Sequence, residues 1–254
     1  FCAARVTAMG TGPLSAGNKG AVAASLALYG STVCLVGSHL AAGSKGPAGR
    51  DADVTRLRAS LRFPDGGADM RPSGAPAPPD TVGAHDFIMW LGDLNYRISR
   101  PDTEVRTHIE SGAPPAELLA SDELREGQAA GRVFVGFTEG SLDFAPTYKF
   151  DAGTDTYDTS AKRRAPAWCD RILWKESEHI RSLSYSSHPN LKDSDHRPVS
   201  AMLEVSVSSD SSLTGATAEM TGVRFANWFS CLTTCVAEKM PCLPIASPAE
   251  YRRL

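Results

Sequence analysis

The stretch 85–95, HDFIMWLGDLN, places an unbroken run of apolar residues directly before a polar turn. Such a run is typical of a strand that is buried on both faces. Asp93 and Asn95 follow the run where the strand is expected to end. Residues i and i+2 of an extended segment share a face, so we expect these side chains to hold a water molecule or a metal-bound phosphate oxygen together. The alternative is a plain Asx turn that closes the strand.

The segments around this stretch predict further strands with helices between them. Apolar runs predict strands, and the polar, punctuated segment 144–167 predicts loops. The expected strands are 22–28, 31–40, 167–174 and 199–207, and the expected helices are 51–62 and two or more segments within 102–131. Short buried strands with polar residues at their ends predict an α/β domain that carries its chemistry on loops at one sheet edge.

Polar residues that could do chemistry follow three other strands. His196 stands beside Asp195, and a histidine takes a proton from water well only when a carboxylate fixes its tautomer. Asp170 is the candidate carboxylate, because a charge inside the apolar run WCDRILW needs a reason. The alternative is a structural ion pair with Arg171 or another base. His39 follows the strand 31–40, and such a histidine is by itself more often structural than catalytic.

Basic residues gather in the segment 144–167 and in a second, shorter one. Tyr148 and Lys149 stand near its start, and Lys162, Arg163 and Arg164 near its end. This cluster suits a substrate with several phosphates, through charge-assisted contacts; the alternative is a solvated surface. The sequence GNKG, with Asn18 and Lys19, is a second possible anion site.

Length and composition bound the remaining possibilities. The chain has 254 residues, 42% hydrophobic and 22% charged, with a net charge of −3, which fits one sizeable domain and argues against broad nucleic-acid binding. Its six cysteines form no CxxC motif, so neither a disulfide framework nor a zinc site is expected, and a reducing compartment fits better. No apolar run reaches the roughly 18–20 residues of a membrane span.

The composition shifts to Ser, Thr and Asp beyond residue 206. We therefore expect one domain over 1–206 and a tail, or the start of a following segment, over 207–254. Apolar residues with helical spacing predict a packed helix in this tail, and membrane-surface contact with an acylated cysteine is the alternative. These residues are Phe225, Trp228, Phe229, Leu232 and Val236.

Taken together, these stretches resemble the inositol polyphosphate 5-phosphatases, most of all the type II and Lowe-syndrome-type members. The matching segments lie in the order of the family and cover about residues 8–205. They include GTGPLSAGNKGAVA, VGSHLAA, FIMWLGDLNYRI, the long segment that ends in APAWCDRILWK, and LSYSSHPNLKDSDHRPVSAML. The resemblance implies the DNase I-like α/β fold, a four-layer sandwich in which two packed mixed sheets are flanked by helices.

The resemblance also implies roles for individual residues. His196 matches the base that activates the attacking water and Asp170 the residue that orients it, while Asp93 and Asn95 match residues that position water and phosphate. Asp195 matches a residue at the metal and phosphate centre, and His39 one that stabilises charge on the scissile phosphate. The substrate-binding matches are Tyr148, Lys149, Lys162 and Arg164 around the 4-phosphate, and Asn18 and Lys19 on the side of the 1-phosphate.

The implied activity is magnesium-dependent removal of the 5-phosphate from phosphoinositides such as phosphatidylinositol 4,5-bisphosphate, or from soluble inositol polyphosphates. The resemblance implies a monomeric, cytoplasmic protein that is peripheral to membranes and binds no nucleic acid. The principal Mg²⁺ ligand of the family is an upstream glutamate, and the chain begins at Phe1, so we expect an N-terminally truncated domain whose own metal ligand is Asp195. Two alternatives stay open: a truncated, non-catalytic phosphoinositide-binding module, and a DNase-like nuclease on the same fold.

Overall fold

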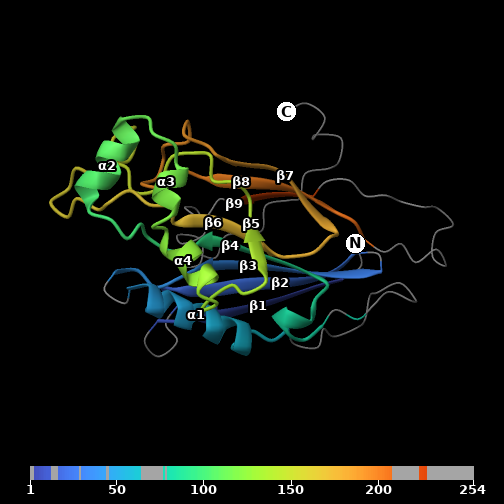
Figure 1. Ribbon diagram of the computed structural model, residues 1–254. Helices are drawn as coiled ribbons and strands as arrows, with labels where there is room; N and C mark the ends of the chain where they lie inside the picture. The colour runs from blue at the N-terminus through green and yellow to red at the C-terminus, as the bar shows by residue number, and fades with distance from the viewer. Residues whose placement is uncertain are drawn as a thin grey trace.

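The computed structural model describes residues 3–12, 17–28, 30–43, 46–63, 77, 79–207 and 223–227. Two β-sheets lie one above the other, with helices below them and at one end (Figure 1). The six-stranded sheet has the order β1-β2-β3-β4-β6-β5, with β1 (Ala3–Gly10), β2 (Gly20–Leu28), β3 (Ser31–His39), β4 (Phe87–Asp93), β5 (Phe137–Glu139) and β6 (Asp170–Lys175). The three-stranded sheet has the order β7-β8-β9, with β7 (Ile180–Ser187), β8 (Val199–Val205) and β9 (Val223–Asn227).

The helices named in the described part of the chain lie between the strands. They are α1 (Gly46–Ser60), η3 (Val82–Ala84), α2 (Asp102–Glu110), α3 (Ala116–Leu119) and α4 (Glu123–Ala129). Asp122 caps α4, because its side chain accepts a hydrogen bond from the backbone N–H of Arg125. No helix in the described ranges is long and apolar enough to cross a membrane.

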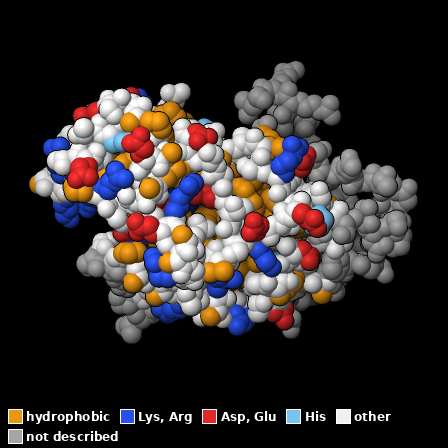
Figure 2. Space-filling view, viewed as in Figure 1, with side chains coloured by type: hydrophobic (Ala, Val, Ile, Leu, Met, Phe, Trp, Pro, Cys, Tyr) orange, Lys and Arg blue, Asp and Glu red, His pale blue; other side chains and the backbone are white. Residues whose placement is uncertain are grey.

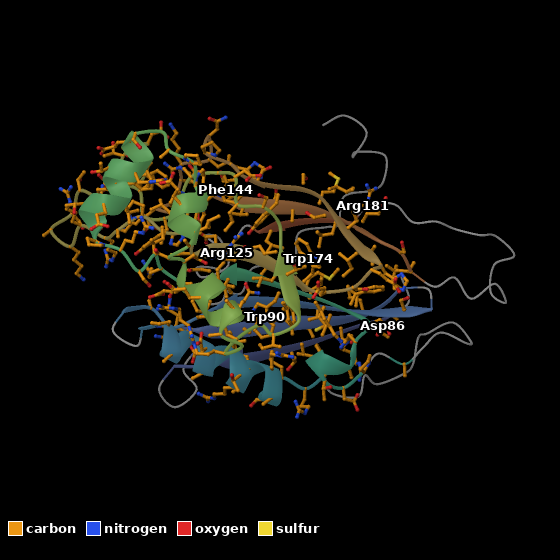
Figure 3. The ribbon with its side chains drawn as sticks, in the orientation of Figure 1. Asp86, Trp90, Arg125, Phe144, Trp174 and Arg181 are labelled. Atoms are coloured by element: carbon orange, nitrogen blue, oxygen red, sulfur yellow. The ribbon has the colours of Figure 1, made fainter. Side chains whose placement is uncertain are left out.

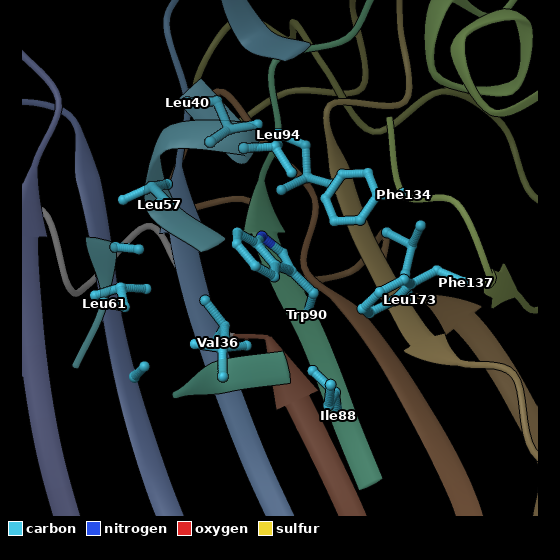
Figure 4. Packing of buried hydrophobic residues seen from close by; sticks show 14 of the residues in the cluster. Val36, Leu40, Leu57, Leu61, Ile88, Trp90, Leu94, Phe134, Phe137 and Leu173 are labelled. Atoms are coloured by element: carbon cyan, nitrogen blue, oxygen red, sulfur yellow. The ribbon is translucent and has the colours of Figure 1, made fainter. Parts of the chain in front are cut away.

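Side chains of β4 enter both of the layers that surround the six-stranded sheet. Trp90 packs with Leu57 of α1, Leu124 of α4 and Phe134 on the helical side, as Figure 4 shows for Trp90, Leu57 and Phe134. Met89, the next residue along the strand, packs with residues of β8 between the two sheets. Trp174 of β6 contributes to the same layer between the sheets (Figure 3). This alternation is why β4 is apolar from Phe87 to Leu91.

The expected α/β class with two packed sheets is confirmed, and so are the expected strands, within two or three residues at their ends. The helix expected over 51–62 begins earlier, at Gly46, and ends at Ser60. The helical segments within 102–131 are α2, α3 and α4. The short strand β5 and the strand β7 were not expected, and the exposed, serine-rich sequence of β7 explains why its apolar pattern is weak.

The prediction of a helix around Phe225 is wrong for the part of the tail that the structure describes. Val223–Asn227 forms β9, which pairs antiparallel with β8 from Val199↔Asn227 to Leu203↔Val223. Pairing with the edge of an existing sheet satisfies the backbone of this segment, and that requirement overrides a helical spacing of apolar residues. Trp228, Phe229, Leu232 and Val236 lie outside the described residues.

Candidate active site

Sheet register brings the predicted site residues of three strands into one row. His39, at the end of β3, is the parallel partner of Asp93 at the end of β4. Asp93 is in turn the antiparallel partner of Asp170, the first residue of β6. Gly92 allows β3 and β4 to approach here: its φ is +136°, and a Cβ at this position would lie 2.0 Å from the carbonyl oxygen of Ser38. The site is thus built at the ends of central strands, as expected.

Asp170 and His196 form the pair that the sequence predicted. Oδ2 of Asp170 lies 2.9 Å from Nδ1 of His196 and also accepts a hydrogen bond of 2.9 Å from the hydroxyl of Thr147. Asp170 is therefore not paired with Arg171. Nδ1 of His196 faces a carboxylate, which leaves its Nε2 as the nitrogen that could take a proton.

Three carboxylates surround His196 and set its charge. Burial lowers the pKa of His196, but the neighbouring charges of Asp170, Asp93 and Asp195 outweigh burial and raise this pKa to about 9. Burial raises the pKa of Asp170, opposed by its contact with His196. In the free protein at neutral pH, both ring nitrogens of His196 therefore carry a proton, and the proton on Nδ1 is hydrogen-bonded to Asp170.

His39, Asp93 and Lys19 form a second group of contacts in the row. Nε2 of His39 lies 2.9 Å from Oδ2 of Asp93 and also hydrogen-bonds to Nζ of Lys19. Nδ1 of His39 is buried and has no hydrogen-bond partner in the described part of the chain. Burial raises the pKa of Asp93, but His39, His196 and Lys19 outweigh burial, so the pKa is lowered and the carboxylate stays ionised. Lys19 is therefore part of the site. Asn18 is exposed in the turn before β2 and contacts none of the described site residues.

Asn95 reaches the site by a turn and not by an extended segment. Its φ is +57°, its backbone N–H donates to Oδ1 of Asp93 at 3.0 Å, and its side-chain amide donates to Oδ2 at 3.2 Å. The expectation that the two residues share a strand face is wrong, because the Asp93 carboxylate folds the chain back into an Asx turn. The turn still brings the two side chains together.

A groove of about 1020 Å³ lies beside the row. The predicted residues Lys149, Lys162, Arg164 and Asp195 line it. Nζ of Lys149 lies 2.7 Å from Oδ2 of Asp195, and this contact raises the pKa of Lys149. Tyr148 is buried, and its ring packs against the ring of His196 at 4.6 Å between centroids. Tyr148 therefore packs against His196 and does not line the groove, while the three basic residues do.

The described residues do not make up a magnesium site on their own. They contain no group of three or more His, Cys, Asp or Glu side chains that could hold a metal ion. The carboxylate of Asp195, the expected ligand, is occupied by the ammonium of Lys149.

Sequence reasoning missed Arg97, which joins two of the predicted residues. Its Nη2 donates to Oδ1 of Asn95 at 2.6 Å, and its guanidinium lies 4.4 Å from the ring centroid of Tyr148. The amide oxygen of Asn95 is therefore held by Arg97, and its amide nitrogen by Asp93 and by the carbonyl of Leu40. The position two residues after Asn95 was the only signal in the sequence, and it did not show where the side chain points.

Comparison with known proteins bears on this arrangement. The family model "Endonuclease/Exonuclease/phosphatase family 2" matches residues 2–202. The type II inositol 1,4,5-trisphosphate 5-phosphatase of Mus musculus is 46% identical over 201 residues, covering 78% of this chain and 19% of that protein. Synaptojanin of Caenorhabditis elegans is 43% identical over 192 residues, covering 74% of this chain and 16% of that protein.

A solved structure also aligns with most of the chain. The inositol polyphosphate 5-phosphatase domain of SPsynaptojanin, in complex with inositol (1,4)-bisphosphate and calcium ion, matches with a TM-score of 0.69 and 34% identity. The match covers 92% of this chain and 59% of that chain. The expected DNase I-like fold is thereby confirmed. The chain spans less than a fifth of the length of the two curated relatives named above.

Proposed function

This chain belongs to the endonuclease/exonuclease/phosphatase family 2, among relatives named as inositol 5-phosphatases, and on that premise we propose that it hydrolyses the 5-phosphate of phosphoinositides or of soluble inositol polyphosphates. Phosphatidylinositol 4,5-bisphosphate is the proposed lipid substrate. The activity of the whole protein belongs to this proposal, because the relatives are much longer than the part that matches.

One observation carries the proposal. His196, which contacts Asp170, follows Asp195 in the sequence. The carboxylate of Asp195 is bound by Lys149, and both residues line a groove together with Lys162 and Arg164. A base beside several cations suits hydrolysis of one phosphate on a ring that carries others, because cations bind the neighbouring phosphates through charge-assisted hydrogen bonds.

The residues support the following reaction. Asp170 accepts the Nδ1–H of His196, so Nε2, once it has released its own proton, takes a proton from a water molecule. The water oxygen forms a bond to phosphorus while the bond from phosphorus to the ring oxygen at position 5 breaks. The ring oxygen gains a proton by way of solvent, and the products are inorganic phosphate and an inositol hydroxyl. Lys19, next to His39 and Asp93, supplies positive charge for the phosphate oxygens.

Magnesium dependence is part of the proposal. It is supported by the family resemblance and by the calcium ion in the SPsynaptojanin complex. A divalent cation supplies positive charge that polarises a phosphoryl oxygen. Because the described residues do not make up a metal site on their own, we assign it no position here.

Two rival functions predict different substrates. A DNase-like nuclease on this fold needs a surface that attracts a polyanionic backbone, whereas the face in Figure 2 mixes acidic and basic side chains, and the chain has a net charge of −3. A non-catalytic module would keep the basic groove without turnover. The Asp170–His196 pair favours the enzyme over this module, since binding alone needs no oriented base. We also propose a cytoplasmic, monomeric protein that contacts membranes peripherally, because its lipid substrate lies in a membrane surface.

The test is phosphate release by the full gene product that contains this chain. The substrates are phosphatidylinositol 4,5-bisphosphate in phosphatidylcholine vesicles and inositol 1,4,5-trisphosphate, each assayed with Mg²⁺ and with EDTA. We expect Mg²⁺-dependent release that His196→Asn lowers by at least about hundredfold. The matched control is His188→Asn, an exposed histidine whose Nε2 hydrogen-bonds to Ser200 Oγ. Substrate binding without release by the wild type would establish the binding module, and cleavage of DNA in place of these substrates would establish the nuclease.

A further inference from the structure

The loop that carries two of the groove's cations rests on α2, a helix that contributes no groove-lining residue. Lys162 and Arg164 lie in the segment 157–164, which contains neither helix nor strand. Figure 1 shows this part of the chain, coloured yellow, beside α2 at one end of the molecule. The segment's regular backbone pairing is limited to the bridge of Tyr157 with Phe150, so its shape also depends on side-chain contacts.

Arg106 of α2 supplies those contacts from one guanidinium. Nη1 donates to the carbonyl oxygen of Tyr157 at 3.2 Å, and Nη2 donates to the carbonyl oxygens of Asp158 at 3.0 Å and Arg164 at 3.2 Å. Arg106 therefore holds both ends of the loop at once. Only a planar group with several fixed donors reaches three carbonyls in this way, so a lysine cannot replace it fully.

Asp102, one turn earlier in α2, fixes the orientation of this guanidinium. Its Oδ1 lies 2.6 Å from Nε of Arg106, and its Oδ2 lies 2.7 Å from Nε of Arg163 in the loop. The carboxylate is thus shared between the helix and the loop. Burial raises the pKa of Asp102, but the two arginines outweigh burial and lower it, so the carboxylate is ionised at neutral pH.

Asp158 holds the same loop from the inside. Its carboxylate accepts hydrogen bonds from the backbone N–H groups of Ser160 at 3.0 Å and Arg164 at 2.9 Å. Its own N–H donates to the carbonyl oxygen of Lys149 at 2.8 Å, which ties the loop to the third cation of the groove. The positions of Lys149, Lys162 and Arg164 are therefore coupled through one network that is anchored on α2.

We propose that Arg106 is a positioning residue that sets the preference of the site for rings carrying a second phosphate beside the scissile one. The proposal rests on the proposed function. Arg106 does not line the groove, so it acts through the loop and not by touching the substrate. When the loop is already ordered, substrate binding does not have to overcome the entropy cost of ordering the loop. Only a substrate whose additional phosphate reaches the loop cations benefits from this saving.

The test compares Arg106→Met with Arg125→Met, a matched replacement of an exposed arginine on α4 (Figure 3). Kinetics of the full gene product are measured with inositol 1,4,5-trisphosphate and with inositol 1,5-bisphosphate, which lacks the 4-phosphate. For Arg106→Met we expect KM for the trisphosphate to rise roughly tenfold while kcat changes less than about twofold. For the bisphosphate we expect KM to change less than about twofold, and Arg125→Met should match the wild type with both substrates.

A binding measurement separates this proposal from the proposed function. Calorimetric titration with inositol (1,4)-bisphosphate needs no turnover, and Arg106→Met should bind it roughly tenfold more weakly than the wild type even if neither protein releases phosphate. Asp102→Asn, a milder change, should weaken binding in the same direction and serves as the test variant if Arg106→Met does not fold. Unchanged binding, or an equal loss with both kinetic substrates, would overturn the proposal.

Discussion

Oδ2 of Asp170 lies 2.9 Å from Nδ1 of His196, although 26 positions separate the two residues along the chain. Asp170 begins β6 in the six-stranded sheet, and His196 lies just before β8 of the three-stranded sheet. The pair therefore joins the two sheets at the site, and its geometry depends on how the sheets pack.

Asp170→Asn should lower kcat by at least about hundredfold with little change in KM, because the amide no longer holds His196 in the tautomer that leaves Nε2 free. Both kinetic constants are measured from phosphate release with inositol 1,4,5-trisphosphate as the substrate. Thr147→Val removes only the other hydrogen-bond partner of Asp170 and should cost much less. A kcat for Asp170→Asn within about twofold of the wild type would contradict the assigned role.

Lys149→Met should raise KM for inositol 1,4,5-trisphosphate by about tenfold or more, because a charge-assisted hydrogen bond contributes about 1.5–3 kcal/mol. The control is Lys192→Met, which also loses an ion pair with an aspartate, Asp155, but on an exposed loop. Kinetics at two salt concentrations test both variants. If the two variants raise KM equally, then a general surface charge and not the groove binds the substrate.

Arg171→Met should reduce the free energy of unfolding by about 3–5 kcal/mol, because it removes the cation that pairs with the buried carboxylates of Asp122 and Glu139. Chemical denaturation measures this change. Arg181→Met on β7 (Figure 3) breaks an exposed ion pair with Glu204 of β8 and should cost less than about 1 kcal/mol. Similar losses for the two variants would show that the buried network adds no more to stability than a surface pair.

The stability of the wild type should fall between pH 7 and pH 5 more than that of His85→Gln. Burial lowers the pKa of His85 below its ordinary value of 6.5, although hydrogen bonds to the carbonyls of Val82 and Thr81 oppose the shift. Ser25 Oγ occupies the other ring nitrogen at 2.7 Å. The unfolded chain then binds a proton that the folded chain binds only at lower pH, so stability is present above about pH 6.5 and is lost as the pH falls.

Urea denaturation at several pH values measures the slope for both proteins. Contributions from the other histidines are common to the two and cancel in the difference. Equal slopes between pH 7 and pH 5 would show that His85 binds its proton as readily in the folded chain as in the unfolded one.

Much of the fold could be predicted because strand signals are local. The run at β4 and the run WCDRILW are mostly apolar, and that pattern does not depend on what they pack against. The strand β7 was not predicted because five of its residues are exposed and its sequence carries no clear apolar face. The tail segment that forms β9 escaped because its conformation is decided by the free edge of β8, which lies some twenty residues away along the chain.

For the candidate site, too, the sequence predicted some features and not others. Residue types and motif spacing were enough to name His196, Asp170, Asp93, His39 and Lys149. They did not show that Asn95 lies in a turn with positive φ, or that Arg106 and Asp158 hold the loop of Lys162 and Arg164. Those contacts join side chains to backbone carbonyls and N–H groups, which are the same in every residue and leave no trace in the sequence.

By itself the sequence determined which chemical groups are available and which segments are strands, since both depend on a few neighbouring residues. Only the tertiary structure decided which groups meet. Asp170 and Arg171 are adjacent in β6, yet Asp170 contacts His196 while Arg171 contacts Asp122 and Glu139. Successive side chains of a strand point to opposite faces, so the register of β6 against its neighbours placed one charge in the candidate site and the other in the buried core.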